Sequence, residues 1–185
     1  MVDPGDEIDE IMAIVSRHHL QVTSIVVTHS HIDHIGGAKK MKQATGAPVY
    51  LNEHDLELYK HLGEQASMIG LPTPETTEID LTLSDGQTLR NGGLQATVLH
   101  TPGHTPGSVC LLLKAKESPV LIAGDTLFRD GIGRTDLRGG DTRKILRSLQ
   151  DKLLPLDDST IVIPGHGPVT SIGREREFNP FLQNI

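Results

Sequence analysis

The chain has 185 residues, of which 36% are hydrophobic and only 3% aromatic, so aliphatic side chains must build most of its core. Acidic residues outnumber Lys and Arg by 24 to 17, and the resulting formal charge of −7 argues against a nucleic-acid surface, which needs clustered cations. The sequence shows neither the run of roughly 20 apolar residues that a membrane span needs nor a secretory signal, so we expect a cytoplasmic protein forming one domain over residues 1–185.

The first half of the chain alternates helical and strand patterns. Apolar residues at helical spacing follow a Pro-Gly turn, and a β-branched run typical of a buried strand comes next. The predicted elements, in chain order, are a helix over 6–20, a strand over 22–28, a helix over 35–45 ended by Gly46, a strand over 49–51, a helix over 53–62 and an exposed loop over 63–78.

From residue 79 onward the pattern is mainly that of strands separated by turn residues. The predicted strands are 79–83, 87–89, 94–100, 108–114, 120–123 and 161–163. A helix is predicted over 141–154, with Asp141 or Thr142 as its N-cap and Pro155 as its end. The single cysteine, Cys110, lies in an apolar run, and we expect it to be a small buried hydrophobic residue that forms no intrachain disulfide.

A dense group of metal-ligand residue types follows the first predicted strand. Within the block His29-Ser30-His31-Ile32-Asp33-His34, four of six residues carry an imidazole or a carboxylate. A lone His-x-His would be weak evidence, because on a strand it merely places two rings on one face. The complete block is more specific, since four such groups would be costly to gather without a ligand, and it predicts a metal site in a loop.

Three further candidates each lie in a turn after a predicted strand. They are His104 in Thr101-Pro102-Gly103-His104-Thr105-Pro106-Gly107-Ser108, Asp125 in Ala123-Gly124-Asp125-Thr126, and His166 in Pro164-Gly165-His166-Gly167-Pro168. Each alone could be an ordinary turn residue. Together with the first block, they supply five His and two Asp, enough for two adjacent divalent ions that share a carboxylate.

These motifs, in this order, resemble those of the metallo-β-lactamase superfamily, and the resemblance runs from Asp3-Pro4-Gly5 to the C-terminus. Within that superfamily, Gly131-Ile132-Gly133-Arg134-Thr135-Asp136 and the segment from Thr170 to Leu182 resemble single-domain glyoxalase II-like hydrolases. The resemblance implies an αββα sandwich of two mixed sheets flanked by helices. The hairpin with which family members usually begin is expected to be missing here, because Met1 lies at the Asp-Pro-Gly segment.

The resemblance also implies a ligand set and a reaction. The first metal would take His29, His31 and His104, the second would take Asp33, His34 and His166, and Asp125 would bridge the two. The ions would be Zn²⁺, or alternatively Fe²⁺ or Mn²⁺. A bridging hydroxide would attack a small-molecule thioester, S-(2-hydroxyacyl)glutathione, with Asp33 orienting the nucleophile.

Arg134 is the cation that the resemblance places on glutathione, although a solvated loop arginine is the simpler interpretation. The helical C-terminal domain of two-domain glyoxalase II enzymes has no counterpart in the 19 residues after His166. Oligomeric state is not indicated by any feature of the sequence.

Three other functions compete with this hypothesis. A persulfide dioxygenase looks similar around residues 133–136 but uses one iron held by two His and one Asp. Another hydrolase of the same fold, a lactonase or a β-lactamase, is a further alternative, although Asp125 stands where many secreted β-lactamases carry a Cys. A metal-binding module without activity would need closed, saturated sites, whereas seven ligands for two ions leave positions open.

Overall fold

The computed structural model describes residues 1–91, 93–115, 117–183 and 185. These residues form two compact units, Met1–Leu83 (unit 1) and Ser84–Ile185 (unit 2), each with its own hydrophobic core. The prediction of a single domain over 1–185 stays a prediction. In the part of the chain that the structure describes, no helix combines the length and the apolar character needed to cross a membrane.

Unit 1 contains a small parallel sheet covered by helices. Its strands are β1 (Ile25–Val26), β2 (Val49–Leu51) and β3 (Leu81–Thr82), in the order β1-β2-β3, all parallel. Parallel neighbours need a crossover connection, which usually contains a helix, and the segments between these strands are helical. The helices of this unit are α1 (Ile8–Arg17), α2 (Ile32–Ile35), α3 (Ala38–Thr45), a 3₁₀ turn (Glu53–Asp55), α4 (Leu56–Tyr59) and α5 (Leu62–Met68).

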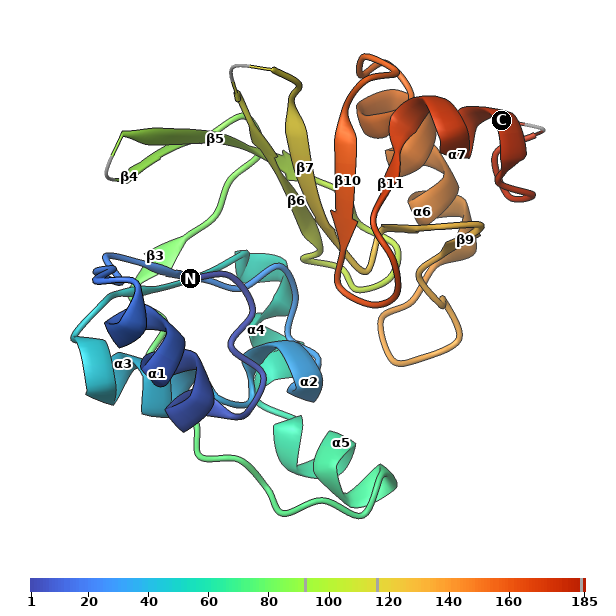
Figure 1. The fold of residues 1–185 in the computed structure, drawn as a ribbon. Coiled ribbons are helices and arrows are strands. Elements are labelled where there is room, and N and C mark those ends of the chain that lie inside the picture. Colours follow the sequence, from blue (N-terminus) through green and yellow to red (C-terminus); the bar gives the residue numbers. More distant parts are fainter. Residues whose placement is uncertain (92, 116, 184) are drawn as a thin grey trace. The chain divides into compact units, whose positions relative to one another are not determined.

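The core of unit 1 lies between this sheet and its helices. Figure 1 shows α1 and α3 on one face of the sheet, and the buried cluster joins Ile8 of α1 and Met41 of α3 to Ile25 and Val49 of the strands. Gly46 ends α3 in the left-handed conformation, with a φ of 70°, as its position after the predicted helix indicates.

Unit 2 contains a larger mixed sheet. Among the described residues it has six strands in the order β11-β10-β7-β6-β5-β4, in which only β7 and β10 pair in parallel. A separate hairpin is formed by β8 (Leu127–Phe128) and β9 (Gly131–Ile132). The strands of the large sheet are β4 (Thr88–Asn91), β5 (Leu94–His100), β6 (Val109–Leu113), β7 (Val120–Gly124), β10 (Ile161–Pro164) and β11 (Thr170–Ser171).

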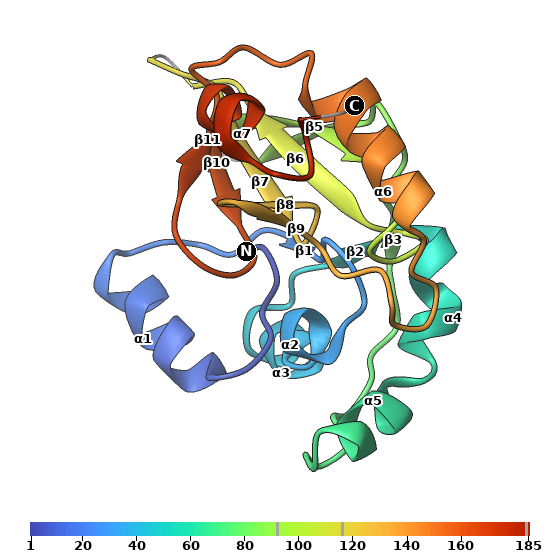
Figure 2. The same cartoon turned by 90° about the vertical axis from the view of Figure 1, so that its right-hand side faces the viewer.

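Two helical segments cover one face of this sheet. Figures 1 and 2 both show α6 (Thr142–Ser148), which continues as a π-helical turn over Leu149–Leu153, on the same side as α7 (Ile172–Phe178). The carboxylate of Asp141 accepts hydrogen bonds from the backbone N–H groups of Arg143 and Lys144, which confirms it as the N-cap of α6. The core beneath these helices includes Cys110, whose predicted burial is confirmed.

Most predicted elements are present, with shifted bounds. The strand predicted over 94–100 matches β5, whereas the one predicted over 22–28 shortens to two residues, because only Ile25 and Val26 pair with β2. The prediction that the whole metal block forms a loop is wrong, since residues 32–35 form α2, where the backbone N–H of Ile35 donates to the carbonyl of His31. The loop predicted from residue 63 begins only after α5.

Candidate metal centre

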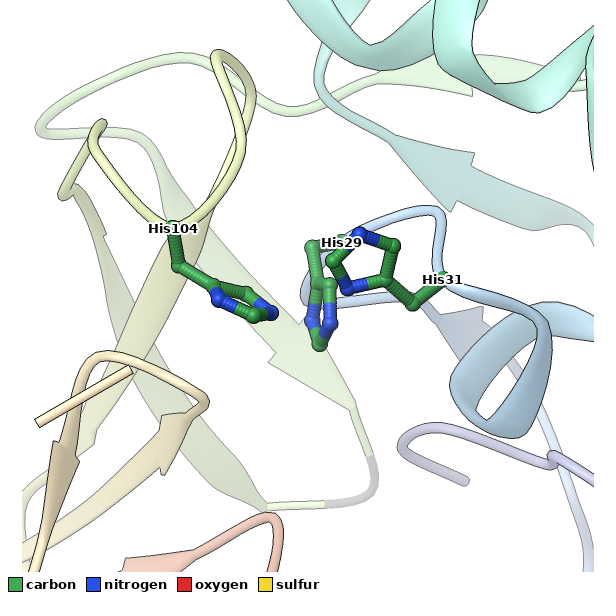
Figure 3. Close-up of side chains that lie close together, drawn as sticks. All are labelled: His29, His31 and His104. Atoms are coloured by element: carbon green, nitrogen blue, oxygen red, sulfur yellow. The ribbon is translucent and has the colours of Figure 1, made fainter. Parts of the chain in front are cut away.

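In unit 1 the ligand-type residues lie on the segment that joins β1 to α2. His29 and His31 precede the helix, and Asp33 and His34 lie on its first turn. The rings of His29 and His31 meet edge to face, with centroids 4.8 Å apart and planes at 87° (Figure 3). The rings of His29 and His34 are 4.0 Å apart, and Nε2 of His34 lies 3.7 Å from Oδ2 of Asp33. Three imidazoles and a carboxylate of one short segment are thus gathered within unit 1.

Asp3 holds this segment through three hydrogen bonds. Its Oδ1 accepts from the backbone N–H of Thr28 at 2.7 Å, and its Oδ2 accepts from the Thr28 hydroxyl at 2.7 Å. The same Oδ2 lies 2.9 Å from Nδ1 of His34. Because an ionised carboxylate only accepts hydrogen bonds, Nδ1 of His34 carries a proton, and in the neutral imidazole Nε2 then bears the lone pair.

The same reasoning fixes the tautomer of His29. Nδ1 of His29 lies 3.1 Å from the hydroxyl oxygen of Thr28. That hydroxyl has one hydrogen, which it donates to Asp3, so it can only accept from His29. Nδ1 of His29 therefore carries the proton and Nε2 bears the lone pair, and Asp3 sets the tautomers of two histidines from a position remote in the sequence.

Two further side chains hold the backbone of this segment. The carboxylate of Asp55, which is fully buried, accepts from the backbone N–H of Ser30 at 2.8 Å. The amide of Gln65, on α5, accepts from the N–H of Ile32 at 3.0 Å and donates to the carbonyl of Ser30 at 3.1 Å. The backbone between His29 and Asp33 is therefore fixed from two separate elements.

Gly5 lets the N-terminal segment approach α2 closely. A Cβ at Gly5 would lie 1.8 Å from the carbonyl oxygen of Asp33, a distance that any side chain would forbid. This contact brings the segment that carries Asp3 against the helix that carries Asp33 and His34. The Asp-Pro-Gly sequence at residues 3–5 thus combines a carboxylate that sets tautomers with a glycine that permits the approach.

In unit 2 the ligand-type residues come from three turns that follow strands. Asp125 follows β7, His104 lies beyond the end of β5, on its own turn (Figure 3), and His166 follows β10. Oδ2 of Asp125 lies 3.6 Å from Nε2 of His104 and 3.7 Å from Nε2 of His166. The imidazole of His104 is buried, whereas that of His166 is 55% exposed. The structure therefore brings together these three predicted residues within unit 2.

The orientation of His104 is fixed by the loop after β9. Its Nδ1 lies 2.8 Å from the carbonyl oxygen of Arg134, which can only accept, so Nδ1 carries the proton and Nε2 faces Asp125. A Cβ at Gly133 would lie 1.9 Å from the carbonyl oxygen of Asp125 and 3.0 Å from Cβ of His104. Only glycine allows the loop to pass this close to both residues.

The turn of His104 is also packed against α6. Gly103 has a φ of 141°, and a Cβ there would lie 2.2 Å from the backbone nitrogen of Ile145. The hydroxyl groups of Thr101 and Thr126 are 2.9 Å apart, which joins the turn after β5 to the turn after β7. His104 and Asp125 are thus positioned by contacts among their own turns.

Arg134 is engaged by a neighbouring carboxylate. Its Nε and one terminal nitrogen each donate to Asp136 at 2.8 Å, and both side chains are exposed. The guanidinium holds the pKa of Asp136 down to about 2, and the carboxylate raises the pKa of Arg134. Binding of a substrate carboxylate by Arg134 stays a prediction, and a substrate would compete with Asp136 for it.

The residues that hold the ligand segment in place were not predicted from the sequence. Asp3, Asp55 and Gln65 contact the ligand segment from far along the chain, and no local pattern links them to it. Asp3 could have been found, because it begins the Asp-Pro-Gly segment at which the resemblance starts. Asp55 and Gln65 carry no comparable signal.

The donor set fits divalent metal ions. Histidines that bind metals almost always donate their other ring N–H to a carboxylate, a carbonyl or a similar acceptor, which fixes the tautomer. His29, His34 and His104 each have such an acceptor at Nδ1, so each neutral imidazole carries its lone pair on Nε2. Carboxylates lie beside two of these nitrogens, Asp33 at His34 and Asp125 at His104. Imidazole and carboxylate together suit zinc, iron and manganese.

Comparison with known proteins assigns the family. The sequence model of the metallo-beta-lactamase superfamily matches residues 1–166. The chain belongs to this superfamily. The hydroxyacylglutathione hydrolase GloC of Haemophilus influenzae is 39% identical to this metallo-β-lactamase superfamily chain over 186 residues, which cover all of this chain and 87% of GloC.

Similar solved structures confirm the predicted αββα fold class. The B3 metallo-beta-lactamase BLEG-1 is 40% identical, with a TM-score of 0.91 over 98% of this chain and 87% of its own. The protein TTHA1623, solved in a di-iron-bound form, is 39% identical, with a TM-score of 0.86 over 97% of this chain and 87% of its own. The match thus extends over nearly the whole length of the chain.

Proposed function

We propose that this superfamily member is a binuclear metal-dependent hydrolase that cleaves S-(2-hydroxyacyl)glutathione thioesters in the cytoplasm. The observation that carries the metal-dependent part is the fixed tautomer of His29, His34 and His104, each with Nδ1 bound to an acceptor. The thioester part is supported by the 39% identity to GloC over the full length of this chain. A metal-dependent hydrolase is also what the superfamily as a whole indicates.

The proposed ligand assignment uses the donors of both units. His29, His31 and His104 would hold one ion, and Asp33, His34 and His166 the other, with Asp125 shared. Zn²⁺ is our first choice, because it accepts imidazole and carboxylate donors and leaves positions open in catalytic sites. Fe²⁺ is the leading alternative, since TTHA1623 binds two irons at 39% identity, and Mn²⁺ is a further one.

Bound ions of this kind lower the pKa of water toward 7 and polarise a carbonyl oxygen. The residues of the chain complete the chemistry. Asp3 at His34 and the Arg134 carbonyl at His104 each accept from Nδ1, which places the lone pair of the neutral imidazole on Nε2. Asp33, whose side chain is 53% exposed beside His34, would accept a hydrogen bond from the attacking water and orient it. A thiolate leaves without a strong general acid, because thiol pKa values lie near ~8.5.

β-Lactam hydrolysis is the second candidate, since BLEG-1, a B3 metallo-beta-lactamase, is 40% identical to this chain. The two reactions differ in their leaving group. An amide nitrogen must be protonated as it leaves, whereas a thiolate need not be. Thioester cleavage therefore makes the smaller demand on the acid groups of the protein.

The deciding experiment compares three reactions of purified protein whose metal content has been measured by elemental analysis. We expect thiol release from S-lactoylglutathione with kcat/KM at least about 100 times that for a chromogenic cephalosporin, within the range that enzymes reach for preferred substrates. Oxygen consumption with glutathione persulfide would instead support a dioxygenase. A higher rate on the cephalosporin, or no thiol release with two equivalents of metal bound, would reject the proposal.

Two histidine variants control this measurement. His104→Ala should bind less metal than the wild type. Its kcat should fall by at least about 1,000-fold, as expected when an essential group is removed. His18→Ala alters an exposed histidine at the end of α1 and should change neither. Equal losses in both variants would show that the activity does not depend on the proposed ligands.

A further inference from the structure

A pocket of about 510 Å³ lies entirely within unit 1, beside Asp33. Its volume falls within the roughly 300–1,000 Å³ of typical small-molecule sites. The apolar part of its lining comes from Ile32 of α2 and from Ile69, Leu71, Pro72 and Pro74, which follow α5. None of these five apolar side chains carries a metal-ligand group. The proposed metal site therefore does not explain why they gather here.

The floor of this pocket is backbone that cannot move aside. Gly5, Gly36 and Gly37 line it, and each packs against another part of the chain at a distance that excludes a side chain. A Cβ at Gly36 would lie 2.9 Å from the carbonyl oxygen of Gly5, and one at Gly37 would lie 2.6 Å from that of Pro4. The floor is therefore fixed by the same contacts that position Asp33.

Hydrogen bonds hold the chain in place before and after the wall, which is formed by residues 69–75. Before the wall, Gln65 of α5 binds the backbone of Ser30 and Ile32. A Cβ added at Gly63 would lie 3.4 Å from Cγ2 of Thr73, so the wall passes close to the start of α5. Beyond the wall, the hydroxyl of Tyr59 donates to the carbonyl of Thr77 at 3.0 Å and accepts from its N–H at 2.8 Å. Two prolines further restrict the wall, so the pocket exists before any ligand binds.

Two lysines and three acidic residues line the pocket. Lys39 and Lys40 lie with Asp6, Asp33 and Glu75 along its lining, and Lys39 pairs with Glu75 at 2.7 Å. The slight acidic excess does not favour an anionic group deep in the pocket. The apolar side chains are nevertheless exposed, Ile69 by 58% and Leu71 by 54%, and exposed apolar side chains that gather in a cavity indicate a ligand.

We propose that this pocket binds the uncharged hydrocarbon part of the acyl group, so that the preferred substrates carry a bulky or aromatic 2-hydroxyacyl group rather than a lactoyl group. The inference rests on the proposed function, in which Asp33 lies at the reacting thioester. Because Asp33 also lines the pocket, an acyl group held at that carboxylate would direct its side chain between Ile32 and Leu71. A methyl group leaves this space unfilled, whereas a phenyl ring occupies it.

A binding experiment tests the pocket without any turnover. Ile32 and Ile69 are labelled at their methyl groups, and the wild-type protein is titrated with mandelate, the product carrying a phenyl ring, and separately with lactate. Mandelate should shift both methyl resonances in a saturable way at concentrations at which lactate shifts neither. Absence of a mandelate-induced shift, or equal shifts with both acids, would overturn the inference.

A kinetic experiment adds a matched pair of variants. We expect the wild type to prefer S-mandeloylglutathione over S-lactoylglutathione by about tenfold in kcat/KM, a normal gain for filling an apolar pocket. Leu71→Asp should abolish this preference, measured as the ratio of the two kcat/KM values. Met68→Asp changes an exposed residue of the same region that does not line the pocket, and it should preserve the preference.

The outcomes separate the two proposals. Cleavage of neither thioester rejects the proposed function, whatever mandelate does to the methyl resonances. Cleavage of both thioesters with no preference, or with the same loss in Leu71→Asp and Met68→Asp, rejects only the acyl pocket.

Discussion

The two units hold their ligand-type residues by different means. In unit 1 these residues are nearly contiguous in sequence, and side chains from distant positions, Asp3, Asp55 and Gln65, fix them through hydrogen bonds. In unit 2 they come from three separate turns at strand ends, and glycines fix them by allowing backbone to approach backbone. A contiguous cluster needs polar support from outside, whereas residues at the ends of paired strands are already positioned by the sheet.

This difference implies two kinds of vulnerability. Unit 1 should be sensitive above all to the loss of a hydrogen-bonding group that supports the ligand segment, in addition to any side chain added at Gly5. Unit 2 should be sensitive to the addition of a single methyl group at a glycine, because a backbone atom cannot rotate away as a side chain can.

The largest effect is expected at Gly103 of unit 2. Gly103→Ala places a Cβ 2.2 Å from the backbone of Ile145 at a φ of 141°, and it should lower the free energy of unfolding by about 3–5 kcal/mol, measured in urea. Gly86→Ala is the matched control, since Gly86 also has a positive φ of 75° but nothing lies within 4 Å of its Cβ position. It should cost about 1 kcal/mol, the strain of the conformation alone. Equal losses would show that close packing at Gly103 is not the cause.

The next effect is expected at Asp3 of unit 1. Asp3→Asn introduces an amide in place of an acceptor for Nδ1 of His34 and for the Thr28 hydroxyl, so both tautomers lose their support. Metal affinity should fall by about 10- to 100-fold, as for other residues that orient metal-binding histidines. Competition with a chromogenic chelator measures this affinity. Asp6→Asn, an exposed neighbour, should leave it unchanged, and a similar fall there would contradict the role of Asp3.

A smaller effect is expected at Glu175, a buried carboxylate of unit 2 that is held by hydrogen bonds. Burial alone would raise its pKa, but hydrogen bonds from Thr170, the Asp130 N–H, Arg174 and Asn179 hold the pKa below its usual value of 4.5. The resulting stability is fully present above pH ~4.5 and is lost as the pH falls through the lowered pKa. Glu175→Gln should reduce the unfolding free energy at pH 7 by about 1–2 kcal/mol and flatten its acid dependence. An unchanged acid dependence in urea titrations at pH 7 and pH 3.5 would argue against this role.

The smallest effect is expected at the exposed pair of Arg134 and Asp136. Arg134→Ala should raise KM for a glutathione thioester more than it lowers kcat, if the guanidinium binds a substrate carboxylate. Asp136→Asn removes the competing carboxylate and should lower KM by about twofold, because exposed ion pairs are weak. Steady-state kinetics on both variants tests the role, and an unchanged KM in Arg134→Ala would reject it.

The sequence predicted the parts of the fold and site that depend on local patterns. The strand over 94–100, the N-cap at Asp141 and the position of Asp125 and His166 after strands all follow from periodicity and turn chemistry. The short α2 was missed, because a single helical turn within a block of polar residues has no periodicity to detect.

The supporting residues were missed for a different reason. Asp3 is 31 positions from His34, and Asp55 is 25 positions from Ser30, so only the folded chain reveals their contacts. The tautomers of the histidines depend on these contacts and could not be derived from the spacing of the histidines. Likewise, the packing of Gly133 against Asp125 requires the hairpin of β8 and β9, which has no clear strand pattern.

The cysteine in the middle of the large sheet gives unit 2 a built-in reporter of its own opening. Cys110 is fully buried on β6, and burial raises the pKa of its thiol to about 11. Alkylating reagents react with the thiolate, so in the native state both access and ionisation are blocked. The rate at which iodoacetamide modifies the folded protein therefore measures how often β6 becomes exposed, with no label to introduce and no second cysteine in the sequence to confuse the signal.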